Sequence, residues 1–396
     1  MTITGSNSGG SKRRLRLGMV GGGPGAFIGA VHRIAARLDD RYELVAGAFS
    51  SDPERARASG RELHIAPDRT YASIKEMAAT EARRPDRIDV VAIVTPNHLH
   101  YDAAKVFLEA GIHVICEKPI TISVETALDL AAIVHNSGLV FGLTHNYTGH
   151  PMVRQARQLI SEGGLGAIRV VQVEYVQDWL TTALEKTGQK HAVWRTDPLQ
   201  SGHGGCLGDI GTHAFNLAEF VTGLRCEQIA ADLSTFVPDR KLDDNAQMLL
   251  RFNHGVRGML WASQVASGNE NNLRLRVYGE KAGLEWRQED PNALWITPFG
   301  KPPELIRRAG PGSNAVAAHA SRIPAGHPEG YLEAFAQLYT DLEEQIAAKI
   351  DGRLPDPASL VVPTVDDGVA EMRFIAAAIE SSKKNSAWIG VSEAKG

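Results

Sequence analysis

The first third of the chain alternates short apolar runs with longer stretches of helical periodicity. Short strand-like runs occupy residues 15–20, 42–49, 88–94 and 112–116, and in 88–94 Val, Ile and Ala are nearly continuous. Such runs are typical of strands that are buried on both faces. Between and after them, apolar residues recur at helical spacing, as in 103–108 and 124–136. This strand–helix rhythm predicts an α/β unit built on a doubly wound parallel sheet.

The rest of the chain has a different pattern. Residues 168–175 alternate apolar and polar positions, and further strand-like segments follow at 229–237, 245–252, 256–263 and 273–279. Turn residues separate these segments, which predicts a mostly antiparallel sheet. Helical periodicity marks 152–161, 332–348 and the segment after 364. Residues 287–325 are rich in Pro and Gly and are expected to be irregular.

Composition supports this two-part organisation. A chain of 396 residues is too long for one ordinary core. Its 43% hydrophobic and 22% charged residues are those of a soluble globular protein, and a net charge of −4 favours neither nucleic acid nor an anionic membrane as partner. Three cysteines form no disulfide framework and no metal motif, so a reducing cytoplasm is expected. No apolar run is long enough to span a bilayer.

A glycine-rich run from Gly21 to Gly29 joins the first strand to the first helix. Strand, glycine loop and helix N-terminus together place backbone N–H groups against a pyrophosphate. Gly21 and Gly23 fit the first two glycines of G-x-G-x-x-G, and the third position is either Ala26 or, if the loop carries an insertion, Gly29. The residues expected to line a dinucleotide here are Gly21, Gly23, Ala26, Phe27 and Ile28.

The end of the second strand leaves the choice of dinucleotide open. A carboxylate at this point normally binds the ribose hydroxyls of NAD. Here Ser50 occupies the position, and Asp52 stands where it could cap the helix that Pro53 opens. Ser50, Ser51 and Arg55 could instead accept the 2′-phosphate of NADP. The sequence therefore predicts NAD or NADP without choosing between them.

Two further strands end in polar residues at the carboxyl edge of the predicted sheet, where open α/β sheets bind ligands. Thr95-Pro96-Asn97 ends the third strand, and His98 and His100 follow as surface or helix-start residues. The fourth strand delivers Glu117-Lys118-Pro119 to the same edge. An ammonium group placed there is costly unless something requires it. The alternative is a solvated lysine at an ordinary strand-to-helix junction.

The second part of the chain carries a candidate acid–base pair. Asp209 and His213 are four residues apart, so in a helix they share one face. A carboxylate beside an imidazole can orient it and keep it basic, which suits a proton acceptor near neutral pH. The same residues also fit a capping aspartate and a core histidine. No third ligand lies at metal spacing, so no metal site is predicted.

Several of these motifs resemble the Gfo/Idh/MocA family of oxidoreductases. They are the glycine loop, Thr95-Pro96-Asn97 with Leu99-His100, and Cys116-Glu117-Lys118-Pro119. The resemblance implies that Lys118 lies beside the nicotinamide and that 95–97 lines the cofactor, with His100 and Glu117 close by. The family pattern Asp-x-x-x-His matches Asp209 and His213.

The resemblance also implies a domain organisation. Residues 1–11 form a disordered tail, 12–145 a dinucleotide-binding Rossmann domain, and 146–396 an α+β domain that binds substrate. In relatives the outer face of the large open sheet makes dimers or tetramers, so a homo-oligomer is expected. Many relatives carry an arginine shortly after the asparagine that matches Asn146. Thr148-Gly149 occupies that place here, which puts the contact of that arginine in doubt.

The implied activity is hydride transfer between NAD(P) and a secondary alcohol of a sugar, glycoside or cyclitol. His213 would take the hydroxyl proton, Lys118 would stabilise the alkoxide, and Asp209 would hold the imidazole. The segments around Trp179 and Trp194 most resemble those of levoglucosan and other pyranoside 3-dehydrogenases. Residues expected at the substrate are Asn146, Tyr147, Asp178, Trp179, Trp194, Arg195 and His327. A glycosidase that works by transient oxidation and a non-catalytic nucleotide-sensing protein are the alternatives.

Overall fold

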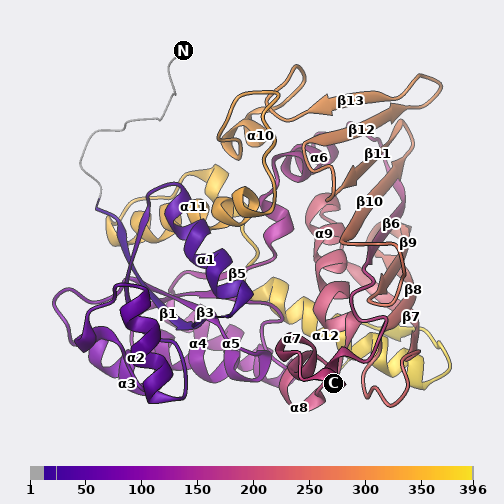
Figure 1. The fold of residues 1–396 in the computed structure, drawn as a ribbon. Coiled ribbons are helices and arrows are strands. Elements are labelled where there is room, and N and C mark those ends of the chain that lie inside the picture. The colour runs from indigo at the N-terminus through magenta and orange to yellow at the C-terminus, as the bar shows by residue number, and fades with distance from the viewer. Residues whose placement is uncertain (1–12, 24, 395–396) are drawn as a thin grey trace.

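The computed structural model describes residues 13–23 and 25–394, so the tail that was predicted to be disordered lies outside the described residues. Two sheets organise the chain, one of five strands and one of nine. Figure 1 shows them side by side, with helices around the first sheet and along one face of the second. Over the described ranges, no helix combines the length and the apolar character needed to cross a membrane.

The five-stranded sheet is parallel and has the strand order β2-β1-β3-β4-β5. Every residue of β3 and β4 is buried, as expected for strands covered on both faces. The predicted doubly wound sheet is therefore confirmed. Its strands are β1 (Leu15–Gly21), β2 (Tyr42–Ala48), β3 (Val90–Val94), β4 (His113–Cys116) and β5 (Phe141–Leu143). Its helices are α1 (Phe27–Leu38), α2 (Pro53–Glu62), α3 (Ile74–Glu81), α4 (His100–Glu109) and α5 (Val124–Ser137).

The nine-stranded sheet has the order β13-β12-β11-β10-β6-β9-β8-β7-β14. β6 pairs with β9 in parallel, and the other neighbours pair antiparallel, so the predicted mostly antiparallel sheet is also confirmed. Its first strands are β6 (Ile168–Val176), β7 (Cys226–Ser234), β8 (Asn245–Phe252), β9 (Arg257–Ser263) and β10 (Asn272–Gly279). The others are β11 (Ala282–Arg287), β12 (Ala293–Pro298), β13 (Glu304–Arg307) and β14 (Ile389–Gly390).

The prediction of irregular structure over 287–325 is wrong. β12, β13 and the helix α10 (Ala315–His319) lie within it. Leu294 and Ile296 are buried on one face of the sheet, whereas Trp295 between them is exposed on the other. Pairing with β11 supplies backbone hydrogen bonds and burial that a local Pro- and Gly-rich composition does not reveal.

The long C-terminal helices tie the two sheets together. α11 (Tyr331–Ile350) packs on α1, where the Tyr339 hydroxyl lies 2.7 Å from His32 Nδ1. α12 (Val365–Lys383) packs on α5 of the first sheet and on β7 of the second. Because α11 contributes to the core beside β1, the domain boundary at residue 145 stays a prediction. The remaining helices are α6 (Pro151–Ser161), α7 (Lys190–Arg195), α8 (Pro198–Ser201), α9 (Thr212–Thr222) and a π-helical turn, η5 (Leu207–Gly211).

The glycine loop after β1 resolves a question that the sequence left open. Gly21 and Gly22 adopt φ of 79° and 70°, in the left-handed region that favours glycine. A Cβ on Gly29 would lie 2.4 Å from Gly22 Cα and 2.7 Å from its carbonyl oxygen. Gly29 therefore supplies the close approach of α1 to the loop, and Ala26 is the residue that precedes the helix.

We predict that Gly29→Ala destabilises the protein by about 2–3 kcal/mol and weakens binding of the expected dinucleotide, because the added methyl meets backbone that cannot rotate away. Gly25→Ala is the matched control, since its φ is 79° but a Cβ there meets nothing within 4 Å. That control should cost about 1 kcal/mol, from strain alone. Urea unfolding and titration with NAD and with NADP measure both effects, and equal losses in the two variants would contradict the assignment of Gly29.

Candidate active site

Glu117 and Lys118 follow β4, and their side chains contact different parts of the structure. The buried Glu117 carboxylate accepts a hydrogen bond from Thr144 Oγ1 at 2.6 Å and lies 2.8 Å from His32 Nε2. Burial acts to raise the pKa of Glu117, but the contacts with His32 and Thr144 outweigh it and hold that pKa below its usual range. Glu117 thus joins the sheet edge to α1, the helix that follows the glycine loop. This placement is behind the expected cofactor surface rather than paired with Lys118.

Lys118 instead reaches across to the second part of the chain. Its Nζ donates to the Asp209 backbone carbonyl and to the Asp209 carboxylate, 3.2 Å away. The other oxygen of that carboxylate accepts from Arg195 Nε at 3.2 Å and from Gln264 Nε2 at 2.8 Å. Burial acts to raise the pKa of Asp209, but the positive charges of Arg195 and Lys118 hold it well below the usual range. Asp209 is therefore an ionised partner that keeps two cations in place.

The expected contact between the side chains of Asp209 and His213 is not found among the described residues. Among the described residues, the side chain of Asp209 binds Lys118, Arg195 and Gln264, and the His213 imidazole lies instead beside His145 and Tyr147. Asp209 sits in the π-helical turn and His213 in α9. A carboxylate near two cations is better stabilised by them than by a neutral imidazole, which explains the difference.

His213 is nearly buried and stays neutral. Burial, the positive charge of Lys118 and the neighbouring His145 together hold the pKa of His213 well below its usual value. Its Nδ1 lies 3.4 Å from Nδ1 of His145, and the Tyr147 ring stands edge-on at 4.9 Å between centroids. A neutral imidazole beside an ammonium group can accept a proton without first losing one.

A polar network continues from this histidine towards the end of β6. The Tyr147 hydroxyl lies 2.6 Å from that of Tyr175, which donates to Asn271 Oδ1 at 2.7 Å. Gln177 also donates to Asn271, and Trp179 Nε1 donates to Gln177. The structure therefore connects the predicted residues Tyr147 and Trp179. The predicted Asp178 accepts from the backbone N–H of Gly268 instead.

The other predicted substrate residues divide into two groups. The Arg195 guanidinium contacts Asp209 and stacks over the Trp194 ring at 4.4 Å, so both residues belong to the site. Asn146 is buried, directly after His145. His327 is exposed in the loop before α11, and its carbonyl accepts from Arg308, so the structure does not gather it with Lys118 and His213.

On the cofactor side, His100 begins α4, which is the helix-start alternative of the prediction, and it is fully buried rather than on the surface. Its ring nitrogens lie 2.8 Å from the Pro119 carbonyl and 2.9 Å from the Thr95 carbonyl, which holds the two strand ends together. Asn97 donates to the Ser201 carbonyl. Pro96 precedes the short turn that leads into α4.

The β2 end agrees with the capping interpretation of Asp52. Its carboxylate accepts from the backbone N–H of Arg55 at 2.8 Å, and Ser50 Oγ accepts from the N–H of Asp52. Ser51 and Arg55 are exposed beside this cap. The strand end itself, at Ser50 and Ser51, has no acidic side chain. This segment therefore does not indicate whether the protein binds NAD or NADP.

The site as a whole fits a dinucleotide. The glycine loop leaves backbone open beside the N-terminus of α1, where Phe27 is exposed and Ile28 half-buried. Thr95 Oγ1 and Asn146 Nδ2 are buried and have no hydrogen-bond partner among the described residues, as expected for groups that bind a polar ligand. Across the described ranges, no set of three His, Cys, Asp or Glu side chains is arranged to hold a metal ion.

Several residues of the site were missed by sequence reasoning. His145, Gln264, Tyr175 and Asn271 come from β5, β9, β6 and the loop before β10, or from the residues just after those strands. None belongs to a local motif, because each is brought in by pairing in the nine-stranded sheet or by the crossing after β5. A polar residue immediately after a buried strand was the one available signal.

Comparison with known proteins agrees with this geometry. Residues 15–145 match the model of an oxidoreductase family with an NAD-binding Rossmann fold, and 153–285 match the GFO/IDH/MocA C-terminal domain. The uncharacterized oxidoreductase YfiI of Bacillus subtilis is 34% identical over 95% of this chain and 96% of its own length. The levoglucosan dehydrogenase of Pseudarthrobacter phenanthrenivorans is 28% identical over 72% of this chain and 76% of its own.

Solved structures show the same similarity. An inositol dehydrogenase homolog from Azotobacter vinelandii, in complex with NADH and myo-inositol, superposes with a TM-score of 0.88 at 36% identity. That match covers 96% of this chain and 98% of the other. The Rossmann sheet, the second sheet and the motifs at their junction thus point the same way, and the chain belongs to the GFO/IDH/MocA family of NAD-dependent oxidoreductases.

Proposed function

We propose that the protein transfers hydride between NAD and a secondary alcohol of a cyclitol or sugar ring. The observation that carries this proposal is the pairing of the partly buried Lys118 ammonium, which binds Asp209, with a histidine whose pKa is held well below its usual value by burial and by that ammonium. Alcohol oxidation needs both a proton acceptor and a positive charge for the developing alkoxide. Lys118 and His213 supply these two functions from opposite sides of the junction between the sheets.

Each side chain has a defined task in this scheme. His213 takes the hydroxyl proton, and the Lys118 ammonium stabilises the negative charge that develops on the oxygen. Asp209 orients Lys118 by accepting a hydrogen bond from its ammonium, and the same carboxylate binds Arg195. The glycine loop, Thr95 and Asn97 would hold the dinucleotide, with Pro96 shaping the turn between them. Bound NAD supplies the hydride acceptor.

Two observations support a polyol ring as the substrate. The site offers hydrogen-bonding side chains from Asn146, Arg195 and Gln264, which suit several hydroxyls on one small molecule. The Azotobacter vinelandii homolog holds myo-inositol, and the levoglucosan enzyme is a more distant relative. A cyclitol is therefore the first candidate, and an anhydrosugar or other pyranoside the second.

A screen of cyclitols and sugars with NAD and with NADP tests this proposal. We expect absorbance of the reduced cofactor to rise with myo-inositol or a related ring, and more with NAD than with NADP. Glycoside cleavage without net reduced cofactor would instead identify a glycosidase. Cofactor binding without turnover of any polyol would contradict the dehydrogenase proposal.

Replacing Lys118 by Ala should lower kcat about 100- to 1000-fold, because the alkoxide loses its charged donor. NAD affinity should stay near that of the wild type, since the glycine loop is unchanged. Lys105→Ala on the surface of α4 is the matched control and should keep full activity. Full activity in Lys118→Ala would exclude the proposed role.

Asp209→Asn should reduce stability most at neutral pH. Because the pKa of Asp209 is held below the unfolded value near 3.8, its stabilisation is complete above that value and is lost as pH falls through the folded-state pKa. The difference in unfolding free energy between the wild type and the variant should therefore shrink on acidification. Urea unfolding across this range measures it, with the exposed Asp129→Asn as control. A difference that is independent of pH would show that Asp209 is not held ionised by its cations.

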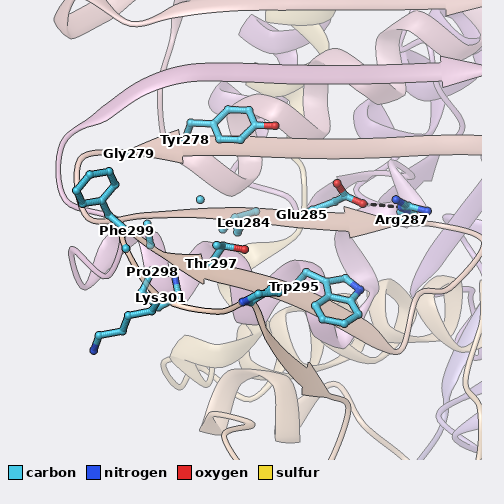
Figure 2. Close-up of a pocket in the computed structure, with 14 residues that line it drawn as sticks. Tyr278, Gly279, Leu284, Glu285, Arg287, Trp295, Thr297, Pro298, Phe299 and Lys301 are labelled. Carbon is cyan, nitrogen blue, oxygen red and sulfur yellow. Dashed lines mark hydrogen bonds and ion pairs between the residues drawn. The ribbon is translucent and has the colours of Figure 1, made fainter.

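We also propose that the outer face of the nine-stranded sheet makes a homo-oligomer. Leu249 of β8 and Met259 of β9 pair on this face and are both exposed. At the other end of the sheet, the rings of Tyr278, Trp295 and Phe299 surround a cleft of about 650 Å³, shown in Figure 2. Exposed apolar side chains spread over one flat face favour association with a second copy.

Charge substitution tests this face. Leu249→Glu combined with Met259→Glu should shift the protein towards monomer in sedimentation velocity, because facing copies would bury four carboxylates. Leu354→Glu is the matched control, since Leu354 is 90% exposed in the loop after α11. A wild type that sediments as a monomer would exclude the oligomer.

A reducing compartment such as the cytoplasm is the final part of the proposal. Cys116, Cys206 and Cys226 are all free and buried. Unpaired thiols in a structured core are usual where disulfides are not formed.

A further inference from the structure

A second histidine lies behind the proposed base and connects it to a buried carboxylate. His145 Nδ1 is 3.4 Å from His213 Nδ1, and His145 Nε2 is 3.4 Å from Glu371 Oε2. The three residues come from different elements: His213 from α9, His145 from the crossing after β5, and Glu371 from α12. Together they form a line that leads away from Lys118 into the core between the sheets.

Burial makes this line unusual. Glu371 is 0% exposed and His145 1%. Neither the oxygens of Glu371 nor Nε2 of His145 have a hydrogen-bond partner of standard geometry among the described residues, and the two groups face each other at 3.4 Å. A buried carboxylate with so few partners lowers stability, so a packing role gives no reason for a glutamate there.

The hydrogen-bonding options of the two imidazoles follow from this carboxylate. A carboxylate at this position can only accept, so it favours the His145 tautomer that carries its proton on Nε2 and leaves Nδ1 bare. Bare Nδ1 of His145 can in turn only accept from His213, whose proton then lies on Nδ1. His213 Nε2 is left with a free lone pair, which is the form that a proton acceptor needs.

We propose that Glu371 and His145 are positioning residues that set the tautomer of His213 and share the proton that it takes from the substrate. This inference rests on the function proposed above. In this proposal Glu371, and not Asp209, is the carboxylate that orients the base, because Asp209 binds Lys118 and Arg195.

The proton can be followed through the line. The O–H bond of the substrate breaks and an N–H bond forms at His213 Nε2. The hydride leaves the carbon that bears this oxygen and would pass to the cofactor. The Nδ1 proton of His213 passes to Nδ1 of His145. His145 is then an imidazolium whose positive charge faces the Glu371 carboxylate, so the charge pair forms as the alcohol is oxidised and no further reactant is required.

The tautomer itself can be measured without any substrate. In full-length protein labelled with ¹⁵N-histidine and saturated with NAD alone, we expect His213 to be protonated at Nδ1 and bare at Nε2. His213→Asn identifies its signals. In Glu371→Gln the amide can donate as well as accept, so both tautomers of His213 should appear. A wild-type His213 that is bare at Nδ1, or a tautomer that Glu371→Gln leaves unchanged, would overturn the proposal.

Kinetics give a second test, with the polyol that the wild type oxidises, starting from myo-inositol. Glu371→Gln and His145→Asn should each lower kcat about 10- to 100-fold with little change in KM for NAD. The double variant should be no worse than the single ones, because residues that act as a unit are not additive. Additive losses would contradict the line of three residues.

Stability separates positioning from packing. Glu371→Leu should keep or raise the free energy of unfolding while kcat falls, whereas a packing role predicts parallel losses. Glu219→Gln is the control, since this buried carboxylate lies on α9 but binds Arg225 and the backbone of Cys226. A wild type that oxidises no polyol contradicts the proposed function. An active wild type with an unaffected Glu371→Gln contradicts only the inference about Glu371 and His145.

Discussion

The ion pair between Lys118 and Asp209 is the interaction on which the arrangement of this protein depends. It joins residues 91 positions apart, one at the carboxyl edge of the parallel sheet and the other in the π-helical turn before α9. Burying an ammonium and a carboxylate is costly unless further groups satisfy them. Arg195 and Gln264 do so on the carboxylate side, and the Asp209 carbonyl does so for the lysine. The two parts of the chain therefore meet at a carboxylate that binds one cation from each of them.

A second set of contacts holds the parallel sheet in register with this pair. Glu117 is fixed by His32 of α1 and by Thr144 after β5, and His100 spans the carbonyls beyond β3 and β4. These bonds join the ends of neighbouring strands at one edge, which is where open α/β sheets bind ligands. Lys118 emerges from a rigid edge, so its ammonium is positioned by the sheet rather than by a mobile loop.

The site divides charge between its two reactive side chains. The Lys118 ammonium lies beside an ionised carboxylate, and burial together with this positive charge holds the pKa of His213 well below its usual value. In the proposed mechanism, one cation thus stabilises the developing alkoxide and disfavours protonation of the base before the substrate reacts. The proposed line through His145 to Glu371 adds a negative charge behind the base, where it favours the imidazolium only after proton transfer. Opposite environments for two neighbouring groups are a common way to run acid–base chemistry at neutral pH.

The sequence by itself determined the elements and the motifs. Buried apolar runs identified the parallel strands, because covering on both faces leaves a local signature. The glycine loop, the Glu117-Lys118-Pro119 segment and the Asp209–His213 spacing were visible for the same reason: each is a local arrangement of residue types. They indicated a dehydrogenase of this family before any contact was known.

Only the tertiary structure decided which groups meet. Asp209 binds Lys118 rather than His213, and Gly29 rather than Ala26 allows the close packing of α1, because each outcome depends on what another segment brings near. β12 and β13 form for the same reason, since β12 pairs with β11 and β13 pairs in turn with β12. His145 and Glu371 belong to no recognisable motif and are 226 residues apart, so the sequence does not indicate that they are neighbours. The sequence shows which chemical groups each segment carries. Which of these groups meet is decided by the free energy of burying them together in the folded chain.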